Sequence, residues 1–283
     1  MVPRGAGSDV SMNAPTRPIL RWHGGKWMLA PWIISHFPRH RVYVAPFGGA
    51  ASVLMRKPRS HAEVYNDLDD EVVNLFRVLR GPQAQNLRDS LRITPFAEVE
   101  FIEAYNPADD DLERARRTVV RSFMGFGSNA VHRRSGFRQN SSRSGTTPAR
   151  DWMNYPDAMN AMIERLQGVV ISHRSACDVM TAHDGPDTLH YVDPPYVFAT
   201  RTDAAADYAH EMTDADHSQM LEVLRSLTGK VVLSGYPHPM YDDALTGWHR
   251  IERKALADGA AARVEVLWMN FAPMGAASQG VLI

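Results

Sequence analysis

Short apolar runs alternate with amphipathic segments along most of the chain. Five runs have the length and composition of buried strands, at residues 42–45, 63–67, 169–173, 189–192 and 230–234. The segments between them have helical spacing at 26–36, 52–57, 69–79 and 213–227. Two further runs, 248–254 and 263–271, predict a closing antiparallel hairpin. Strands that alternate with helices indicate a three-layer, Rossmann-like α/β fold with a mostly parallel sheet.

The pattern changes between Gly81 and Asp157. Residues 96–105 and 112–124 have the spacing of helices, and the second carries arginines opposite its apolar side. A stretch rich in Ser, Arg, Gly and Thr follows, up to Arg150. We therefore divide the chain into a flexible leader at 1–16, a catalytic domain at 17–80 and 158–283, and a small helical insertion at 81–157.

The composition is that of an ordinary globular protein, with 44% apolar residues. No run is long enough for a transmembrane helix, and the first residues lack the apolar core of a signal peptide. Cys177 is the only cysteine, which excludes an internal disulfide and disfavours a zinc-ribbon site. We expect no metal site, no membrane partner and a reducing cytoplasmic location.

Positive charge is concentrated in one part of the chain. The formal net charge is only -1, yet nine arginines lie between Arg114 and Arg150 without one acid among them. Phe126, Phe137 and Trp152 are interleaved with them. Arginines with aromatic residues suit phosphate contact and base stacking, although a solvated helix face or a disordered linker has a similar composition. The segment is a candidate nucleic-acid contact.

The clearest chemical signal follows the apolar run Leu189–Val192, which ends in Asp193-Pro194-Pro195-Tyr196. Proline cannot continue a strand, so a stiff loop should present a carboxylate, the Pro194 carbonyl and an aromatic ring together. The two oxygens can accept both hydrogens of an exocyclic amino group while the ring stacks on its base. For Asp-Pro alone a capped strand end is the better interpretation. The full tetrapeptide favours the amino-group site, provided that a cofactor site exists elsewhere.

Two glycine turns and one acid could form that cofactor site. Trp22-His23-Gly24-Gly25-Lys26 precedes the first predicted helix, and Pro46-Phe47-Gly48-Gly49-Ala50-Ala51-Ser52 joins a strand to a helix, where α/β proteins admit nucleotide-like ligands. The second turn is too short for a phosphate-binding loop. Asp67 follows roughly twenty residues later, the distance of a ribose-binding carboxylate. A helix cap is the alternative for Asp67, with Asp69 and Asp70 inside the following helix.

These elements, in this order, resemble the Dam-type DNA adenine methyltransferases, which use S-adenosylmethionine and carry the signature Asp-Pro-Pro-Tyr. The resemblance runs from about Arg17 to Phe271. Ala51 stands where a second glycine is usual, so we expect the backbone there to avoid positive φ. The resemblance implies catalytic roles for Asp193, Pro194, Pro195 and Tyr196, and cofactor binding by Trp22, Gly25, Lys26, Pro46, Phe47, Gly48, Gly49, Asp67, Asp178 and Asp193.

The family inserts its target-recognition region between the glycine loop and the catalytic loop, which implies that the insertion binds double-stranded DNA. We select Arg133, Arg134 and Arg138 for DNA contact, and Asn129, with Gln139, for reading adenine edges. The target adenine would leave the duplex by base flipping. Residues 199–211 resemble the family's substrate-covering loop, in which His210 is better explained as a surface histidine than as a base.

Other functions stay open from the sequence. The same catalytic loop occurs in enzymes that methylate cytosine-N4 or RNA adenine, and a non-catalytic nucleic-acid-binding protein is a third alternative. A dehydrogenase is disfavoured because the Gly-x-Gly-x-x-Gly spacing is absent. The resemblance implies a monomer or weak dimer, associated with a bacterial or phage nucleoid. Restriction–modification, replication and phage defence are equally compatible settings.

Overall fold

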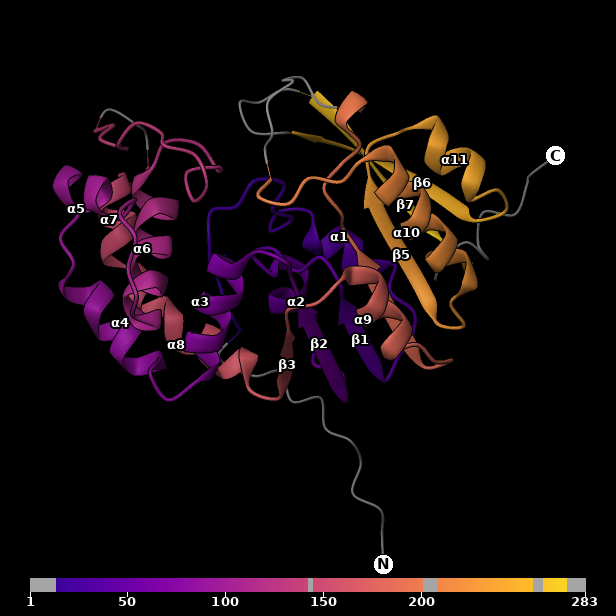
Figure 1. Cartoon of the computed structure of the whole chain (residues 1–283), viewed down its shortest axis with the longest axis horizontal. Helices are drawn as coiled ribbons and strands as arrows, with labels where there is room; N and C mark the ends of the chain where they lie inside the picture. Colours follow the sequence, from indigo (N-terminus) through magenta and orange to yellow (C-terminus); the bar gives the residue numbers. More distant parts are fainter. Residues whose placement is uncertain (1–13, 142–144, 201–207, 257–261, 274–283) are drawn as a thin grey trace, which may run out of the picture.

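A seven-stranded sheet forms the centre of the computed structural model, which describes residues 14–141, 145–200, 208–256 and 262–273 (Figure 1). Its strand order is β3-β2-β1-β4-β5-β7-β6. The first five strands are parallel, and β7 is antiparallel to both β5 and β6. This confirms the mostly parallel sheet with a closing antiparallel pair. The strands are β1 (Val42–Ala45), β2 (Ala62–Asn66), β3 (Val169–Ser172), β4 (Thr188–Val192), β5 (Lys230–Gly235), β6 (His249–Leu256) and β7 (Ala262–Met269).

Helices cover both faces of this sheet, because alternate strand residues point to opposite sides. Tyr43 of β1 packs in a core cluster with α1, α2, α3 and α8, whereas its neighbour Val44 packs against Val179 of α9. Val231 of β5 packs with α10 and α11. The three-layer α/β fold is thus confirmed. The helices named here are α1 (Ala30–Ser35), α2 (Ser52–Arg56), α3 (Asp70–Arg80), α8 (Tyr155–Leu166), α9 (Ala176–Ala182), α10 (Asp214–Ser226) and α11 (Pro239–Ala244).

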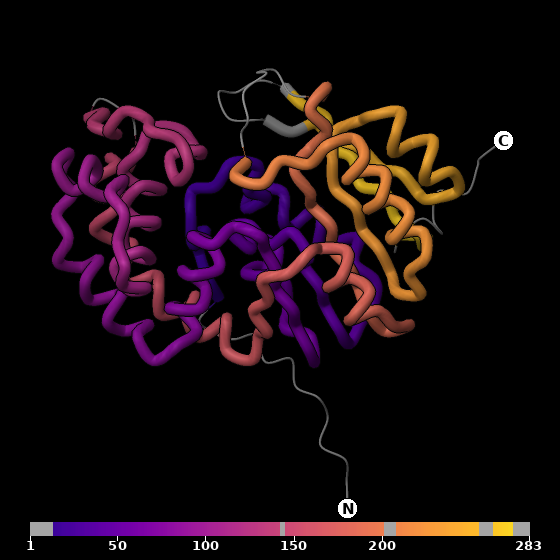
Figure 2. The backbone as a smooth tube through the Cα atoms, in the orientation of Figure 1, coloured from indigo at the N-terminus to yellow at the C-terminus, as the bar shows by residue number. Residues whose placement is uncertain are grey.

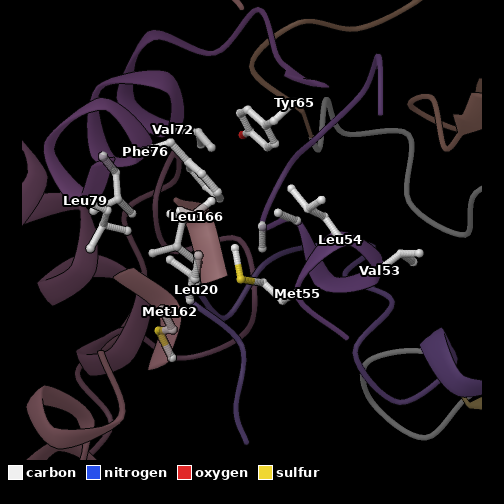
Figure 3. Packing of buried hydrophobic residues seen from close by; sticks show 14 of the residues in the cluster. Leu20, Val53, Leu54, Met55, Tyr65, Val72, Phe76, Leu79, Met162 and Leu166 are labelled. Carbon is white, nitrogen blue, oxygen red and sulfur yellow. The ribbon is translucent and has the colours of Figure 1, made fainter. Parts of the chain in front are cut away.

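The inserted segment forms a helical lobe at one end of the sheet, seen at the left of Figures 1 and 2. It contains α4 (Ala84–Ile93), α5 (Glu98–Glu103), α6 (Asp111–Met124) and α7 (Pro148–Met153), with α8 leading back to β3. Its core is continuous with that of the sheet. Figure 3 shows Phe76 and Leu79 of α3 beside Leu166 of α8, and all three belong to one buried cluster with Met55 of α2.

The arginines of α6 are engaged in ion pairs within the lobe. Arg114 and Arg121 both reach Glu71 of α3, at 3.1 and 2.5 Å. Arg116 and Arg117 both pair with Glu113, one turn earlier on the same helix. We expected one basic segment from Arg114 onward, and the structure corrects this. Glu71 and Glu113, which lie outside the arginine run, neutralise the arginines of α6. Within this arginine run, the residues after α6 remain the candidates for DNA contact.

Two parts of the predicted organisation lie largely outside the described residues. Of the leader at 1–16 only 14–16 is described, and Pro15 is buried. Of the substrate-covering loop at 199–211, residues 201–207 are not described. No helix within the described ranges is long and apolar enough to cross a membrane.

Candidate active site

A large cavity lined by described residues opens at the carboxyl ends of the parallel strands. Its volume is about 620 Å³, which is within the range of small-molecule sites. Residues after β1, β2, β3 and β4 line it, together with residues 22–26 and 208–212. The chain order reverses between the neighbouring strands β1 and β4, and α/β proteins bind their ligands at such a switch point.

The glycine loop after β1 forms one wall and can accept no larger residues at two positions. A Cβ on Gly48 would lie 2.1 Å from the ring of Tyr65, and a Cβ on Gly49 would lie 2.8 Å from Trp22 Nε1. Gly49 also has a φ of 46°. Its N–H donates to Asp67 Oδ2 at 2.7 Å. The structure thus brings together Trp22, the glycine loop and Asp67, as the sequence predicts.

Ala51 corrects one expectation about this loop. Its φ is 55° and its ψ is 30°, so it adopts the left-handed conformation that we expected it to avoid, alone among the described non-glycine residues. The chain turns sharply there, since the N–H of Ala51 donates to Gly48 O at 2.8 Å and α2 begins at the next residue. Alanine adopts this conformation at a cost of about 1–2 kcal/mol, because its Cβ approaches the following carbonyl.

We expect substitutions of Ala51 to separate strain from volume. Ala51→Gly should change the free energy of unfolding by less than about 1 kcal/mol, because relief of strain offsets lost methyl burial and backbone entropy. Ala51→Val should cost more than about 2 kcal/mol, since a β-branched side chain fits this conformation poorly. Urea unfolding of both variants checks this. Equal midpoints would show that the loop conformation imposes no such constraint.

The acids predicted near the cofactor differ in their placement. Asp67 accepts the N–H groups of Gly49 and Asp69 on its two oxygens, and burial raises its pKa. Asp69 lies before α3 as its cap, not inside the helix as we expected, and its Oδ2 is 2.7 Å from His132 Nε2. Asp178 is exposed in the first turn of α9 and does not line the cavity, although Cys177 does.

Asp193 and Lys26 form an ion pair in the part of the cavity lining that we call the cavity floor. Pro194 and Pro195 line the cavity beside them. Lys26 Nζ lies 3.0 Å from Asp193 Oδ1 and donates to Gly24 O at 2.7 Å. Burial raises the pKa of Asp193, Lys26 partly offsets this and Glu265 adds to it, which gives a pKa of about 6. Burial would lower the pKa of Lys26, but Asp193 and Glu265 outweigh it and hold that pKa above its ordinary value.

Tyr196 lies behind this pair and is 6% exposed. Its ring faces Lys26 Nζ at 4.8 Å and meets Tyr236 edge-on, with ring centroids 4.6 Å apart. Its hydroxyl lies 3.3 Å from Asp193 Oδ1 and donates to Glu265 Oε1. The ring does not line the cavity, so stacking of Tyr196 on the target base stays a prediction.

Sequence reasoning missed Glu265, which contacts this group from β7. The signal was present, because Glu265 stands between Val264 and Val266 in an apolar strand, where an acid needs a partner.

A smaller groove lies beside the cavity, with His23 lining both. It has a volume of about 380 Å³, and three of the five predicted DNA residues line it: Asn129, Arg133 and Arg134. Phe126 also lines it and is 74% exposed. Arg138 does not, since its Nη1 donates to Phe123 O at 2.9 Å and ties the loop to α6. Gln139 is exposed outside the groove.

Comparisons with known proteins agree with this geometry. The sequence model of one protein family, the D12 class of N6 adenine-specific DNA methyltransferases, matches residues 22–257 of this chain. The chain is similar to the DNA adenine methylase of Escherichia coli K12, with 24% identity over 75% of this chain and 76% of that one. It is equally similar to a type II methyltransferase of Lactococcus lactis subsp. cremoris, with 24% identity over 83% and 87%.

These matches confirm the resemblance and decide between the substrates that the sequence left open. Adenine in DNA is the base on which this family acts, and a methyl group is what it transfers. The matched residues include both glycine turns, the catalytic tetrapeptide and the whole inserted lobe. The chain therefore belongs to the D12 class of N6 adenine-specific DNA methyltransferases and is a site-specific DNA adenine methyltransferase.

Proposed function

We propose that the methyl donor is S-adenosylmethionine and that it binds in the 620 Å³ cavity. The chemistry of the lining supports this fit. Gly48 and Gly49 keep one wall open, and Asp67 retains a second lone pair on each oxygen for hydroxyl donors. One lysine and several acids line the cavity, which suits a ligand with more positive than negative groups; the acids are Asp67, Asp69, Asp193, Glu211 and Asp216. When bound, this donor supplies an electrophilic methyl group.

The residues of the catalytic loop act on the adenine. The Asp193 carboxylate and the Pro194 carbonyl accept the two amino hydrogens, which directs the nitrogen lone pair away from the ring and toward the methyl group. Asp193 must be ionised to do so, and Lys26 at 3.0 Å favours the ionised form. The chain thus contributes positioning and an oriented electrostatic environment. The ion pair of buried Lys26 with half-buried Asp193, in the lining of a cavity with a glycine wall, is the observation that carries this proposal.

The DNA duplex would lie along the groove that Arg133 and Arg134 line. The amino group of a paired adenine is shielded, so the base must leave the duplex before transfer. His23 lines both the groove and the cavity, so a flipped base has a short route between them. A single chain contains both sites, which supports action as a monomer or weak dimer on double-stranded DNA. A bacterial or phage cytoplasm, at the nucleoid, is the matching location.

Transfer of labelled methyl from S-adenosylmethionine to unmethylated duplex DNA tests the proposal. Nuclease digestion should place the label in N6-methyladenine. Label that appears only on structured RNA would reassign the arginine groove to RNA. Binding of S-adenosylmethionine without transfer to any nucleic acid would support the non-catalytic alternative, and lack of binding would contradict the cofactor assignment.

We expect the double variant Arg133→Ala/Arg134→Ala to weaken DNA binding uniformly across sequences. Each lost phosphate contact should reduce the slope of log affinity against log salt concentration by about 1. The control is Arg88→Ala/Arg92→Ala, which removes the same charge from α4, where both arginines pair with acids. Fluorescence anisotropy over a salt series measures the slopes. Equal slopes for the two double variants would place the DNA elsewhere.

A further inference from the structure

Glu265 is the most buried acid in contact with Lys26, Asp193 and Tyr196, which we call the catalytic group. It is 3% exposed, and its Oε1 accepts a hydrogen bond from Ser234 Oγ at 2.5 Å and another from the Tyr196 hydroxyl. The same oxygen lies 3.8 Å from Lys26 Nζ. Lys26 Nζ in turn lies 3.0 Å from Asp193 Oδ1. One buried ammonium therefore serves two carboxylates, the buried one of Glu265 and the half-buried one of Asp193.

The sheet register explains why an acid of β7 reaches a loop that follows β4. Leu233 and Ser234 of β5 pair with Trp268 and Leu267 of β7, while β5 pairs with β4 on its other side. Leu267 and Met269 pack in the same core cluster as Tyr191, so this face of β7 is the one that Tyr191 and Asp193 share. Glu265, two residues before Leu267, continues that face toward the cavity floor.

A purely structural role does not explain the choice of partners. Burial of a carboxylate costs free energy unless hydrogen bonds and a counter-charge compensate it. An unconnected structural acid would have its own cation, as Glu63 has Lys57 and Arg165 in this chain. Glu265 instead takes its only cation in the described residues from the Asp193 pair. Lys26, Asp193 and Glu265 together carry one more negative charge than positive charge. This excess favours a reaction in which positive charge moves toward Asp193.

We propose that Glu265 is a positioning residue for methyl transfer: it shares Lys26 with Asp193 and fixes Tyr196 beside the catalytic loop, so that Asp193 stays a strong acceptor for the adenine amino group. This inference rests on the proposed function. Removal of the negative charge at Glu265 would leave Lys26 wholly to Asp193. The carboxylate would then hold its ionised form to lower pH and would be better neutralised.

Among the described residues, few groups near Asp193 can alter its pKa at or below neutral pH. Burial raises the pKa of each tyrosine around Asp193, so the tyrosine hydroxyls stay neutral at and below neutral pH. These tyrosines are Tyr43, Tyr191, Tyr196, Tyr236 and Tyr241. Arg263 lies farther away, over the ring of Tyr236. Lys26 and Glu265 are the charges that remain next to Asp193. Lys26 lowers the pKa of Asp193 and Glu265 raises it. The loss of Glu265 must therefore lower it.

The test is the pH dependence of single-turnover methyl transfer at saturating DNA and donor. In the wild type the rate should fall as pH falls through about 6, where Asp193 becomes protonated. Glu265→Gln keeps the shape and the acceptor, so we expect this acid limb to move down by roughly half a pH unit or more, with a rate at neutral pH reduced roughly tenfold. Glu265→Asp retracts the charge by one methylene and should give a smaller shift in the same direction.

Glu252→Gln is the matched control, because this acid lies on the neighbouring strand β6 and is 48% exposed beside Arg250. Its acid limb should coincide with that of the wild type. A merely structural Glu265 would lower the thermal midpoint and the rate at every pH while the limb stayed in place. An unmoved limb in both Glu265 variants overturns the inference.

A measurement that does not depend on turnover separates this inference from the proposed function. Carbon-13 labelling of the aspartate carboxyls, with Asp193→Asn to assign its resonance, follows the titration of Asp193 directly. A lower Asp193 midpoint in Glu265→Gln supports the inference, and an unchanged midpoint contradicts it. Failure of the wild type to methylate DNA would count against the proposed function alone.

Discussion

Asp193→Ala is expected to abolish methyl transfer while binding of the methyl donor persists. The substitution removes the only acidic acceptor that the catalytic loop presents to the amino group. It leaves the glycine wall and Asp67 untouched, and these lie across the cavity. Removal of a group that acts on the reacting atoms typically costs about 10²–10⁴-fold, so the single-turnover rate should fall by at least about 10²-fold.

Single-turnover transfer and calorimetric titration with S-adenosylmethionine measure the two effects separately. Asp178→Ala is the matched control, since Asp178 is exposed on α9 outside the cavity. It should retain both properties. Lost donor binding together with retained turnover in Asp193→Ala would contradict the assignment of Asp193 to the amino group.

Lys26→Met is expected to have the largest effect on stability. It leaves the buried carboxylate of Glu265 and the half-buried carboxylate of Asp193 without their shared cation. Loss of one partner from a buried ion pair typically costs about 3–5 kcal/mol. The variant should therefore melt roughly 10 °C below the wild type at neutral pH. It should also lose methyl transfer, because Asp193 would then be protonated at neutral pH.

The deficit of Lys26→Met should shrink as pH falls, and the sign follows from the pKa of Asp193. That pKa is raised to about 6 in the fold, above its value of about 3.9 in the unfolded chain. The folded state therefore binds the proton more tightly, and this group stabilises the fold as pH falls from above 6 to below 4. Without Lys26 the pKa rises further, so the stabilisation begins at higher pH.

Thermal unfolding at about pH 5.5 and pH 8 checks this dependence. Lys254→Met, which removes an exposed lysine from β6, should melt close to the wild type at both values. An equal deficit for Lys26→Met at the two pH values would show that the carboxylates do not control the loss.

The local sequence was sufficient to predict the sheet and the floor of the cavity. Each parallel strand is a short apolar run, and the acids and glycines that end β1, β2 and β4 meet because parallel strands share a carboxyl edge. Thr213 also caps α10: its side chain accepts the N–H of Asp216, and its own N–H donates to Asp216 Oδ2. These features depend on neighbouring residues, which the sequence displays.

Features that depend on distant residues were not predictable in this way. The pairing of Arg121 with Glu71 joins residues 50 positions apart, so the arginine run resembled a free basic surface. The helices α4, α7, α8, α9 and α11 were missed. The reason is that α4 has a low apolar content, α7 and α8 follow a polar stretch, and α9 and α11 are short. The role of Glu265 required the antiparallel register of β7, which fixes the face on which the acid lies.

The shared core of the lobe and the sheet limits how this enzyme can acquire a new target sequence. Phe76, Leu79 and Leu166 belong to the same buried cluster as residues of the lobe and of the cofactor wall. Exchange of the whole lobe with that of a relative would create cavities or overpacking along the seam, at costs of several kcal/mol. If the proposed groove reads the DNA, we expect new specificity to arise by substitution in the surface loop that carries Asn129, Arg133 and Arg134. Recognition in this chain would then diverge residue by residue rather than by exchange of modules.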